Sequence, residues 1–339
     1  MKILTISIAA YNVERYIDKA LESLIIKNID KLEVLIQDDG SKDKTSVIAR
    51  KYEKMYPESI KVIKKENGGY GSTINNSINM ATGKYFKQLD GDDWYDSHNL
   101  ELLVKELEKI NVDVIYTPYY KYFECSQKIE IVDDLKKKQD GNYELEKFFK
   151  EINQKKFIKI MMHSLIFKTS LLKENNINCL ENCFYTDNEY VLYPLLYSKK
   201  LYIFNLPIYC YRIGREGQSI SIDGRRKHYG DIMKVCRRLL NNVTFLSKEN
   251  YKDMYILEYI STLFNNTISN FLLILPISRK NLKKIKEFDL DIKNKNLFLY
   301  KKMEEKSKTI LFFRKSNYLL YPILHYRTIF KLKKSLKNV

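Results

Sequence analysis

Three carboxylates fall within four residues, in the segment Leu89-Asp90-Gly91-Asp92-Asp93-Trp94. Carboxylates held this close repel one another unless a cation offsets their charge. Because all their ligand atoms are oxygens, Mg²⁺ or Mn²⁺ is favoured over zinc, and either ion would neutralise a phosphate-bearing leaving group. A solvated acidic turn is the alternative interpretation. The apolar run before the cluster and Trp94 after it favour the metal site.

Two further polar clusters could contact a nucleotide. In Asp38-Asp39-Gly40-Ser41 an aspartate can accept hydrogen bonds from a base or from ribose, although a helix-capping turn explains such a cluster more often. Glu66-Asn67-Gly68-Gly69-Tyr70-Gly71 has three Gly within four residues, which exposes N–H groups to phosphates or sugar hydroxyls. It is neither a P-loop nor a dinucleotide fingerprint, and a plain loop is its alternative.

The first 117 residues alternate between predicted strands and predicted helices, and these elements must position the polar clusters. The apolar patterns predict strands at Ile3–Ala9, Leu32–Ile36, Ile60–Ile63, Tyr85–Leu89 and Val112–Thr117. Helical spacing predicts helices at Val13–Ile26, Asp43–Tyr56, Ser72–Ala81 and Asn99–Ile110. This alternation indicates an α/β fold with a mostly parallel sheet. Ligands bind beyond the carboxyl ends of such strands, so Tyr11 and the three polar clusters should meet at one edge.

The remaining chain changes character twice. Residues 118–223 alternate less regularly, with strands expected at Ser164–Phe167, Leu201–Phe204 and Ile208–Tyr211 and a helix at Asn188–Leu196. From about residue 225 the pattern is helical, over Tyr229–Val243 and Tyr251–Leu275. We therefore expect an α/β domain over 1–223, with a first half (1–117) that carries the polar clusters and a less regular second half (118–223). A helical C-terminal region should follow over 224–339.

The net charge of +17 is concentrated near the end of the sequence. Residues 279–339 contain 18 Lys and Arg and 5 Asp and Glu, so they carry +13 of it, and residues 308–339 contain no acidic residue. Aromatic and aliphatic residues interleave with these cations, which is typical of a segment lying on an anionic bilayer. The alternative is a basic tail packed on the protein or on a second copy in a homo-oligomer. No nucleic-acid partner is expected, because no RNP, zinc or helix-turn-helix pattern accompanies the charge.

Composition excludes several protein classes. A hydrophobic content of 45% excludes a wholly disordered chain, and 30% charged residues with a mean hydropathy of −0.40 exclude a polytopic membrane protein. The opening MKILTISIAA is followed by charges and has no cleavage-site pattern, so we interpret it as a first strand and expect a cytoplasmic protein. The five scattered Cys fit reduced thiols, and none of them completes a zinc site.

In order and spacing, three segments closely resemble the family 2 glycosyltransferases of the GT-A fold: SIAAYNVERYIDKALESL, VLIQDDGSKDKT and ENGGYGSTINNSINMATGKYFKQLDGDDW. The resemblance covers roughly residues 1–120. It implies that 1–223 is a GT-A catalytic domain, with a nucleotide-sugar-binding half (1–117) and an acceptor-binding half (118–223). It implies an inverting enzyme that moves a sugar from a nucleotide diphosphate donor to a hydroxyl of a glycan or lipid-linked acceptor. It also implies that Asp39 contacts the base, usually uracil, that Asp90 lies toward ribose and metal, and that Asp92 is the main ligand of Mn²⁺ or Mg²⁺.

The resemblance extends to the rest of the site. The donor-binding residues expected on this basis are Ala9, Tyr11, Asp39, Asn67, Gly68, Asp90, Gly91, Arg212 and Arg215. The family's general base belongs to an E-D pair before an aromatic-rich helix, where Asp187 aligns with the Asp and Thr186 replaces the Glu. Inversion needs such a carboxylate to take the proton of the acceptor hydroxyl. A helix N-cap is the structural alternative for Asp187, and Glu189 is the alternative base.

Residues 211–221 resemble a loop that folds over the donor in many bacterial members of the family. Arg212 and Arg215 could stabilise the leaving pyrophosphate there, or could be solvated loop cations. His163 and His228 could reach the site, although a lone His is more often structural. A pyrophosphorylase is disfavoured because the first strand–helix turn lacks a basic Gly-rich loop. The remaining alternative is a non-catalytic nucleotide-sugar binding protein. The basic tail and the family together suggest surface glycan assembly at the inner face of the cell membrane.

Overall fold

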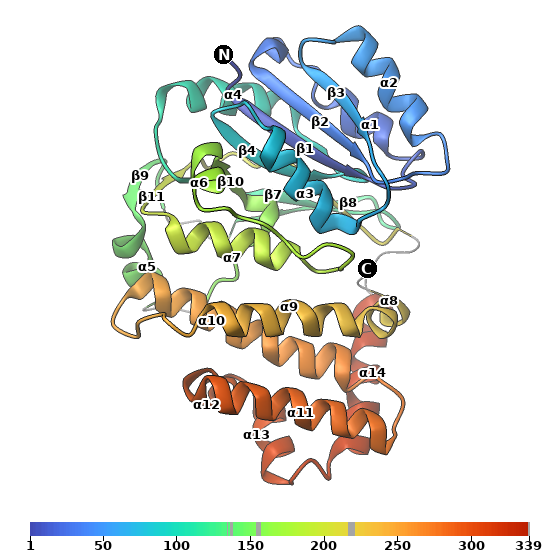
Figure 1. Cartoon of the computed structure of the whole chain (residues 1–339), viewed down its shortest axis with the longest axis vertical. Coiled ribbons are helices and arrows are strands. Elements are labelled where there is room, and N and C mark those ends of the chain that lie inside the picture. Colours follow the sequence, from blue (N-terminus) through green and yellow to red (C-terminus); the bar gives the residue numbers. More distant parts are fainter. Residues whose placement is uncertain (134, 136–137, 154–156, 216–220, 338–339) are drawn as a thin grey trace. The chain divides into compact units, whose positions relative to one another are not determined.

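A computed structural model describes residues 1–133, 135, 138–153, 157–215 and 221–337 (Figure 1). The chain forms two compact units. The first contains Met1–Glu151 and Ile158–Ile213, and the second contains Ile152–Phe157 and Gly214–Val339. The first unit thus ends at Ile213, whereas the sequence-based boundary lies at 223–224, because the last strand of this unit stops there.

An eight-stranded sheet forms the centre of the first unit, in the order β3-β2-β1-β4-β10-β6-β11-β9. Its strands are β1 (Leu4–Ala10), β2 (Leu32–Asp38), β3 (Ile60–Lys64), β4 (Tyr85–Asp90), β6 (Val114–Tyr116), β9 (Gly141–Glu144), β10 (Leu165–Lys168) and β11 (Lys200–Ile203). Strands β1 to β4 pair in parallel, whereas β10 and β9 run antiparallel to their neighbours. The predicted α/β class with a mostly parallel sheet is confirmed.

The helices of this unit are α1 (Ile17–Glu22), α2 (Thr45–Met55), α3 (Gly69–Met80), α4 (Ser97–Lys109), α5 (Leu145–Asn153), α6 (Thr169–Glu174) and α7 (Asp187–Tyr197). The prediction of a long helix over Val13–Ile26 was wrong in extent. Asn12 has a φ of 53°, and the Val13 N–H donates to Thr45 Oγ1 at 2.9 Å. The start of the predicted segment therefore bonds to the turn before α2, and α1 begins only after a hydrogen-bonded turn in which the N–H groups of Tyr16 and Ile17 donate to the Val13 carbonyl.

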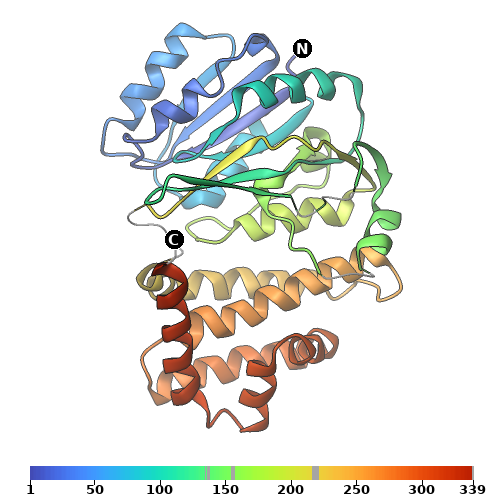
Figure 2. The ribbon, with the colours of Figure 1, turned by 180° about the vertical axis from the view of Figure 1, so that it is seen from behind.

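A smaller sheet that the sequence analysis did not separate follows the order β5-β12-β7-β8. Its strands are β5 (Trp94–Tyr95), β7 (Tyr119–Phe123), β8 (Lys128–Val132) and β12 (Tyr209–Ile213) (Figure 2). Strand β7 is almost wholly aromatic, so it shows no alternation of apolar and polar residues. This sheet attaches to the segment after β4 through β5, and so it supports the acidic turn.

The second unit is helical, as expected. It contains α8 (Ile222–Lys227), α9 (Tyr229–Asn242), α10 (Tyr251–Thr267) with a π-helical extension (Ile268–Leu272), α11 (Arg279–Lys295), α12 (Leu297–Lys306), α13 (Lys308–Lys315) and α14 (Tyr321–Lys337). Its core includes an ion pair between Arg314 and Asp289 at 2.6 Å. None of the helices in the described ranges has an apolar stretch long enough to cross a bilayer.

Candidate active site

The strand register brings the predicted polar clusters to one edge of the large sheet. Ala10 of β1 pairs with Asp38 of β2, and Ala9 pairs with Asp90 of β4. The chain adds β2 and β3 on one side of β1 and then adds β4 on the other side. The point between β1 and β4 is therefore a topological switch point, where open α/β sheets bind ligands. The expectation that these clusters converge is met.

Backbone contacts lock this edge together. The Gly91 N–H donates to the Ala9 carbonyl at 3.0 Å. A Cβ at position 91 would lie 2.8 Å from that carbonyl oxygen, so only Gly permits the contact. Tyr11, directly after β1, is 49% exposed and available to a ligand.

Asp39 lies at the centre of a buried hydrogen-bond set. Its carboxylate accepts from the N–H groups of Gly68 and Gly69, each at 2.9 Å, and from Lys65 Nζ at 2.5 Å. Asn67 Nδ2 donates to the Asp39 carbonyl at 2.9 Å. The carboxylate therefore fixes the Gly-rich segment, a role that the sequence analysis missed. Its contact with a base stays a prediction.

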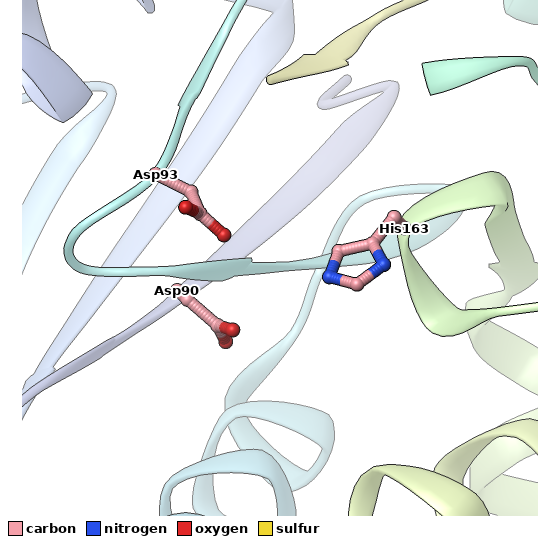
Figure 3. A group of neighbouring side chains, drawn as sticks. All are labelled: Asp90, Asp93 and His163. Carbon is pink, nitrogen blue, oxygen red and sulfur yellow. The ribbon is translucent and has the colours of Figure 1, made fainter. Parts of the chain in front are cut away.

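The acidic turn after β4 forms a compact group with a histidine from a distant segment. Ligand atoms of Asp90, Asp93 and His163 all lie within 4.8 Å of one another (Figure 3). Asp93 is 1% exposed, and it accepts hydrogen bonds from the Tyr209 hydroxyl at 2.6 Å and the Arg212 N–H at 2.7 Å. Burial, together with the charges of Asp92 and Asp90, raises the pKa of Asp93 well above its usual range.

His163 reaches this group because β10 runs antiparallel to β4. Phe167 pairs with Phe86, and the same register continued past the end of β10 places residue 163 opposite residue 90. His163 lies in a short 3₁₀ turn (Met162–Ser164), and its ring stacks on Tyr211 at 4.4 Å between centroids. Burial, with the charges of Lys87 and Lys121, lowers the pKa of His163 to about 3. The ring is therefore neutral at physiological pH.

The group has the donor atoms that a divalent cation needs. Two carboxylates supply oxygens, and the imidazole of His163 supplies a ring nitrogen, with Nε2 on the side of the ring that faces the carboxylates (Figure 3). A neutral imidazole beside two carboxylates fits a divalent-cation site. Asp92 lies on the same turn, half-buried, but its side chain is not part of this group. Its predicted role as main ligand stays a prediction.

Arg212 holds the acidic turn in place through several contacts. Its Nε donates to the Asp92 carbonyl at 2.8 Å, and its guanidinium forms an ion pair with Glu124. The ring centroids of Tyr16 and Trp94 each lie 4.9 Å from the guanidinium carbon. These contacts hold the turn, and a contact with pyrophosphate stays a prediction.

Arg215 and His228, the other basic side chains considered near the donor, do not belong to the unit that carries the acidic turn. Arg215 belongs to the second unit, and residues 216–220 lie outside the described residues. His228 also belongs to the second unit, where its Nδ1 lies 3.1 Å from Asp231 Oδ2. This contact gives His228 a structural role within the helical unit, which is the more common role of a lone His.

Tyr70 is a site residue that the sequence analysis did not single out. Its hydroxyl donates to Asp90 Oδ1 at 2.6 Å and lies 3.2 Å from Met162 Sδ. Burial raises the pKa of Tyr70, and the charges of Asp90 and Asp187 add to the effect. The Tyr70 hydroxyl is thus bonded to the acidic turn, and the charge of the expected general base also affects its pKa. The only sequence signal was an aromatic residue inside the Gly-rich cluster.

Asp187 is the first residue of α7, whose N-cap residue is Thr186. Its side chain is half-buried, and this burial raises its pKa, opposed by the charge of Lys159. Glu189, the alternative base, is fully buried and accepts a 2.7 Å hydrogen bond from the Leu180 N–H. Glu189 therefore holds the preceding loop, and the role of Asp187 as general base stays a prediction.

The loop before α7 packs on the Gly-rich segment. The Asn182 N–H donates to the Gly68 carbonyl at 2.6 Å. A Cβ at Gly71 would lie 2.0 Å from the Leu180 carbonyl oxygen, so Gly alone allows this contact. The backbone thereby links the donor side of the site to the segment that carries Asp187.

Comparison with known proteins identifies the family. Residues 5–171 match the model named "Glycosyl transferase family 2". The chain belongs to glycosyl transferase family 2. As a family 2 glycosyltransferase it carries its Gly-rich segment, acidic turn and His163 inside the matched region, whereas Asp187 lies beyond it.

Individual relatives agree with this assignment. The glycosyltransferase GlyA of Streptococcus pneumoniae is 26% identical over 62% of this chain and 30% of its own length. The solved structure of S. aureus TarS 1-349 in complex with UDP-GlcNAc has a TM-score of 0.67 at 20% identity, covering 94% of this chain and 92% of the TarS 1-349 chain. A Pyrobaculum calidifontis mannosyltransferase, PcManGT, solved with GDP-Man and Mn²⁺, has a TM-score of 0.54 at 13% identity over 95% and 85%. The two structures show the shared GT-A fold.

The match to several curated relatives is partial. The chain spans about a third of the length of the first two that it matches. Because the coverage is partial, these comparisons establish the family and the fold, and the activity of the whole protein is a matter for proposal.

Proposed function

We propose that this chain is an inverting glycosyltransferase that moves a sugar from a nucleotide diphosphate donor, a UDP-sugar, to a hydroxyl acceptor. The observation that carries the proposal is the position of Tyr70. It donates to Asp90 of the acidic turn, and its pKa is also raised by the charge of Asp187. The acidic turn and Asp187, at the start of α7, thus both act on one phenol, which supports a site where a donor diphosphate and an acceptor hydroxyl meet.

Asp187 takes the proton of the acceptor hydroxyl in this proposal. Burial raises its pKa toward the working pH, and a carboxylate with a raised pKa is the stronger base. The oxygen that loses its proton attacks the sugar carbon on the face opposite the leaving diphosphate. One new C–O bond forms as the old one breaks, and the configuration at that carbon inverts.

A divalent cation, Mn²⁺ or Mg²⁺, is proposed at the acidic turn. The residues that would hold it are Asp90, Asp93 and His163, with Asp92 as the additional ligand that the family resemblance implies. When bound, the cation would offset the negative charge of the leaving diphosphate. Support comes from the carboxylate–imidazole donor set and from PcManGT, which was solved with Mn²⁺.

The UDP donor rests on two observations. Asp39 lies at the β2 end of the edge and resembles the base-contacting Asp of the family, and TarS was solved with UDP-GlcNAc. The acceptor is proposed to be a glycan or a lipid-linked glycan. The basic composition of residues 279–339 supports a peripheral location at the inner face of the cell membrane.

A thermal-shift and activity panel tests the proposal. UDP-, dTDP- and GDP-sugars are added with and without Mn²⁺, because a ligand that binds the native state raises apparent stability. We expect the largest shift for a UDP-sugar with Mn²⁺, and slow donor hydrolysis that is lost in Asp187→Asn. A metal-dependent shift without turnover on any acceptor would favour the alternative, a non-catalytic nucleotide-sugar binding protein.

A further inference from the structure

One face of helix α14 presents apolar side chains to solvent. Leu319, Ile323, Tyr326 and Phe330, here called the apolar stripe, are 80%, 64%, 68% and 71% exposed. Ile323, Tyr326 and Phe330 lie three and four residues apart, which places them on one side of α14, and Leu319 lies in the turn before the helix. Large apolar side chains aligned in this way mark an interaction surface more often than scattered ones do.

Cations border the apolar stripe. Arg327, Lys331, Lys333 and Lys334 are all exposed, and residues 308–339 contain no Asp or Glu. At 100° per residue, Lys333 falls on one side of the apolar stripe and Arg327, Lys331 and Lys334 fall on the other. An apolar band with cations on both sides is complementary to the surface of an anionic bilayer, where charged headgroups lie outside an apolar layer.

The opposite face of α14 fixes this orientation. Tyr321, Leu324 and His325 are buried in the second unit. The Tyr321 hydroxyl donates to the Leu275 carbonyl at 3.0 Å, and His325 Nδ1 donates to the Leu273 carbonyl at 2.8 Å. The helix therefore cannot turn its apolar stripe inward without breaking these contacts.

Helix α13, the other helix of the basic tail, packs some of its apolar and basic side chains inside the second unit. Ile310 and Phe313 of α13 are buried, and Arg314 is paired with Asp289 and Glu304. The expectation that all of residues 308–339 lie on a bilayer is thus too broad, because α13 packs within the second unit. The outer face of α14, together with Leu319 in the turn before it, combines exposure, apolarity and positive charge.

We propose that the apolar stripe inserts into the headgroup region of an anionic phospholipid bilayer, with α14 lying in the plane of the surface. The exposed aliphatic and aromatic groups supply shallow apolar burial, and the bordering cations attract anionic headgroups. Each signal is weak alone, but together they give stable peripheral binding. The inference deepens the proposed action on a lipid-linked acceptor, and the binding itself needs no catalysis.

Vesicle co-sedimentation of the full chain tests the proposal. The probes are phosphatidylcholine vesicles with and without phosphatidylglycerol, at low and high salt. The triple variant I323S/Y326S/F330S should lose about tenfold or more in partition to anionic vesicles. The variant K331Q/K333Q/K334Q should lose the preference for phosphatidylglycerol and the salt dependence. The control F245S removes an aromatic group that is 70% exposed elsewhere in the same unit, and it should bind like wild type.

Two outcomes overturn the inference. Equal vesicle binding by wild type and the stripe variant removes the apolar stripe from the interface. Absence of vesicle binding, with a wild-type dimer that the stripe variant abolishes, assigns the apolar stripe to contact between copies of the chain. Donor hydrolysis is measured in the same samples without lipid, so failure of the proposed transferase is recognised separately from failure of membrane binding.

Discussion

The Tyr70 hydroxyl donates a 2.6 Å hydrogen bond to Oδ1 of Asp90. This bond joins the N-terminal turn of α3 to the end of β4 and fixes one carboxylate of the acidic turn. A phenol bonded to a carboxylate orients that carboxylate and stabilises its charged form. Tyr70 is therefore a positioning residue for the metal and diphosphate side of the site.

Tyr70→Phe should raise the Mn²⁺ concentration needed for half-maximal activity by about tenfold, the loss of one hydrogen bond to a charged group. The fold should persist, since the ring is retained. Metal titration of donor hydrolysis measures the effect. Tyr197→Phe is the matched control because Tyr197 is 47% exposed, at the far end of α7. Identical metal dependence in Tyr70→Phe and wild type would remove the positioning role.

Asp187→Asn should lower kcat by about 10²–10⁴ and leave donor affinity little changed, because loss of a general base acts on the chemical step. Since burial raises the pKa of Asp187, kcat/KM of the wild type should increase with pH through that raised value as the carboxylate ionises. Pre-steady-state and pH–rate measurements check both points. A variant that loses donor binding instead would move Asp187 to the nucleotide side.

Asp92 and Asp93 should respond differently to substitution. Asp92→Ala should abolish metal-dependent transfer with little change in melting temperature, because its side chain is half-buried on a turn. Asp93→Ala should destabilise the protein by about 1–3 kcal/mol, because the Tyr209 hydroxyl and the Arg212 N–H lose their acceptor. Urea unfolding with metal-dependent assays separates the two effects. Near wild-type turnover of Asp92→Ala in Mn²⁺ would show that Asp92 is not a ligand.

Asp39→Ala should raise the donor KM by about one to two orders of magnitude and also loosen the Gly-rich segment. The second effect follows from the hydrogen bonds that Asp39 accepts from Gly68, Gly69 and Lys65. Lys65→Met separates the two, because it removes one loop contact and keeps the carboxylate. We expect its KM to change far less. Equal kinetics of the wild type with UDP and GDP donors would argue against base selection by Asp39.

Lys87 provides a test by pH. Its ammonium is buried and donates to the His163 carbonyl at 2.8 Å, and burial lowers its pKa from 10.5 to about 7. Between these two values the unfolded chain binds a proton that the folded chain does not, so this group makes stability rise with pH. The free energy of unfolding should therefore rise more steeply from pH 7 to 10 in wild type than in Lys87→Met. Parallel curves would mean that Lys87 keeps its ordinary pKa.

The sequence determined the elements and the sheet edge. Apolar runs before Asp38 and Asp90 and helical spacing between them required a parallel α/β sheet, and parallel strands end on one side. Asp90, Gly91 and Asp39 could therefore be assigned to a common edge before any coordinates. Asp187 could be aligned only through its family motif, because a single carboxylate at a helix start has no periodic signal of its own.

Only the tertiary structure decided which side chains share that edge. His163 joins Asp90 and Asp93 because β10 inserts antiparallel between β4 and β6, and a strand's direction and register are not encoded in its apolar pattern. The contacts of Arg212 with Glu124 and with the acidic turn depend on the small sheet, which the sequence did not reveal because the aromatic strand β7 shows no alternation. The tail was visible as charge in the sequence. Which face of α14 is exposed was set by the packing of Tyr321 and His325, because a helix buries the side that finds partners in the rest of the fold.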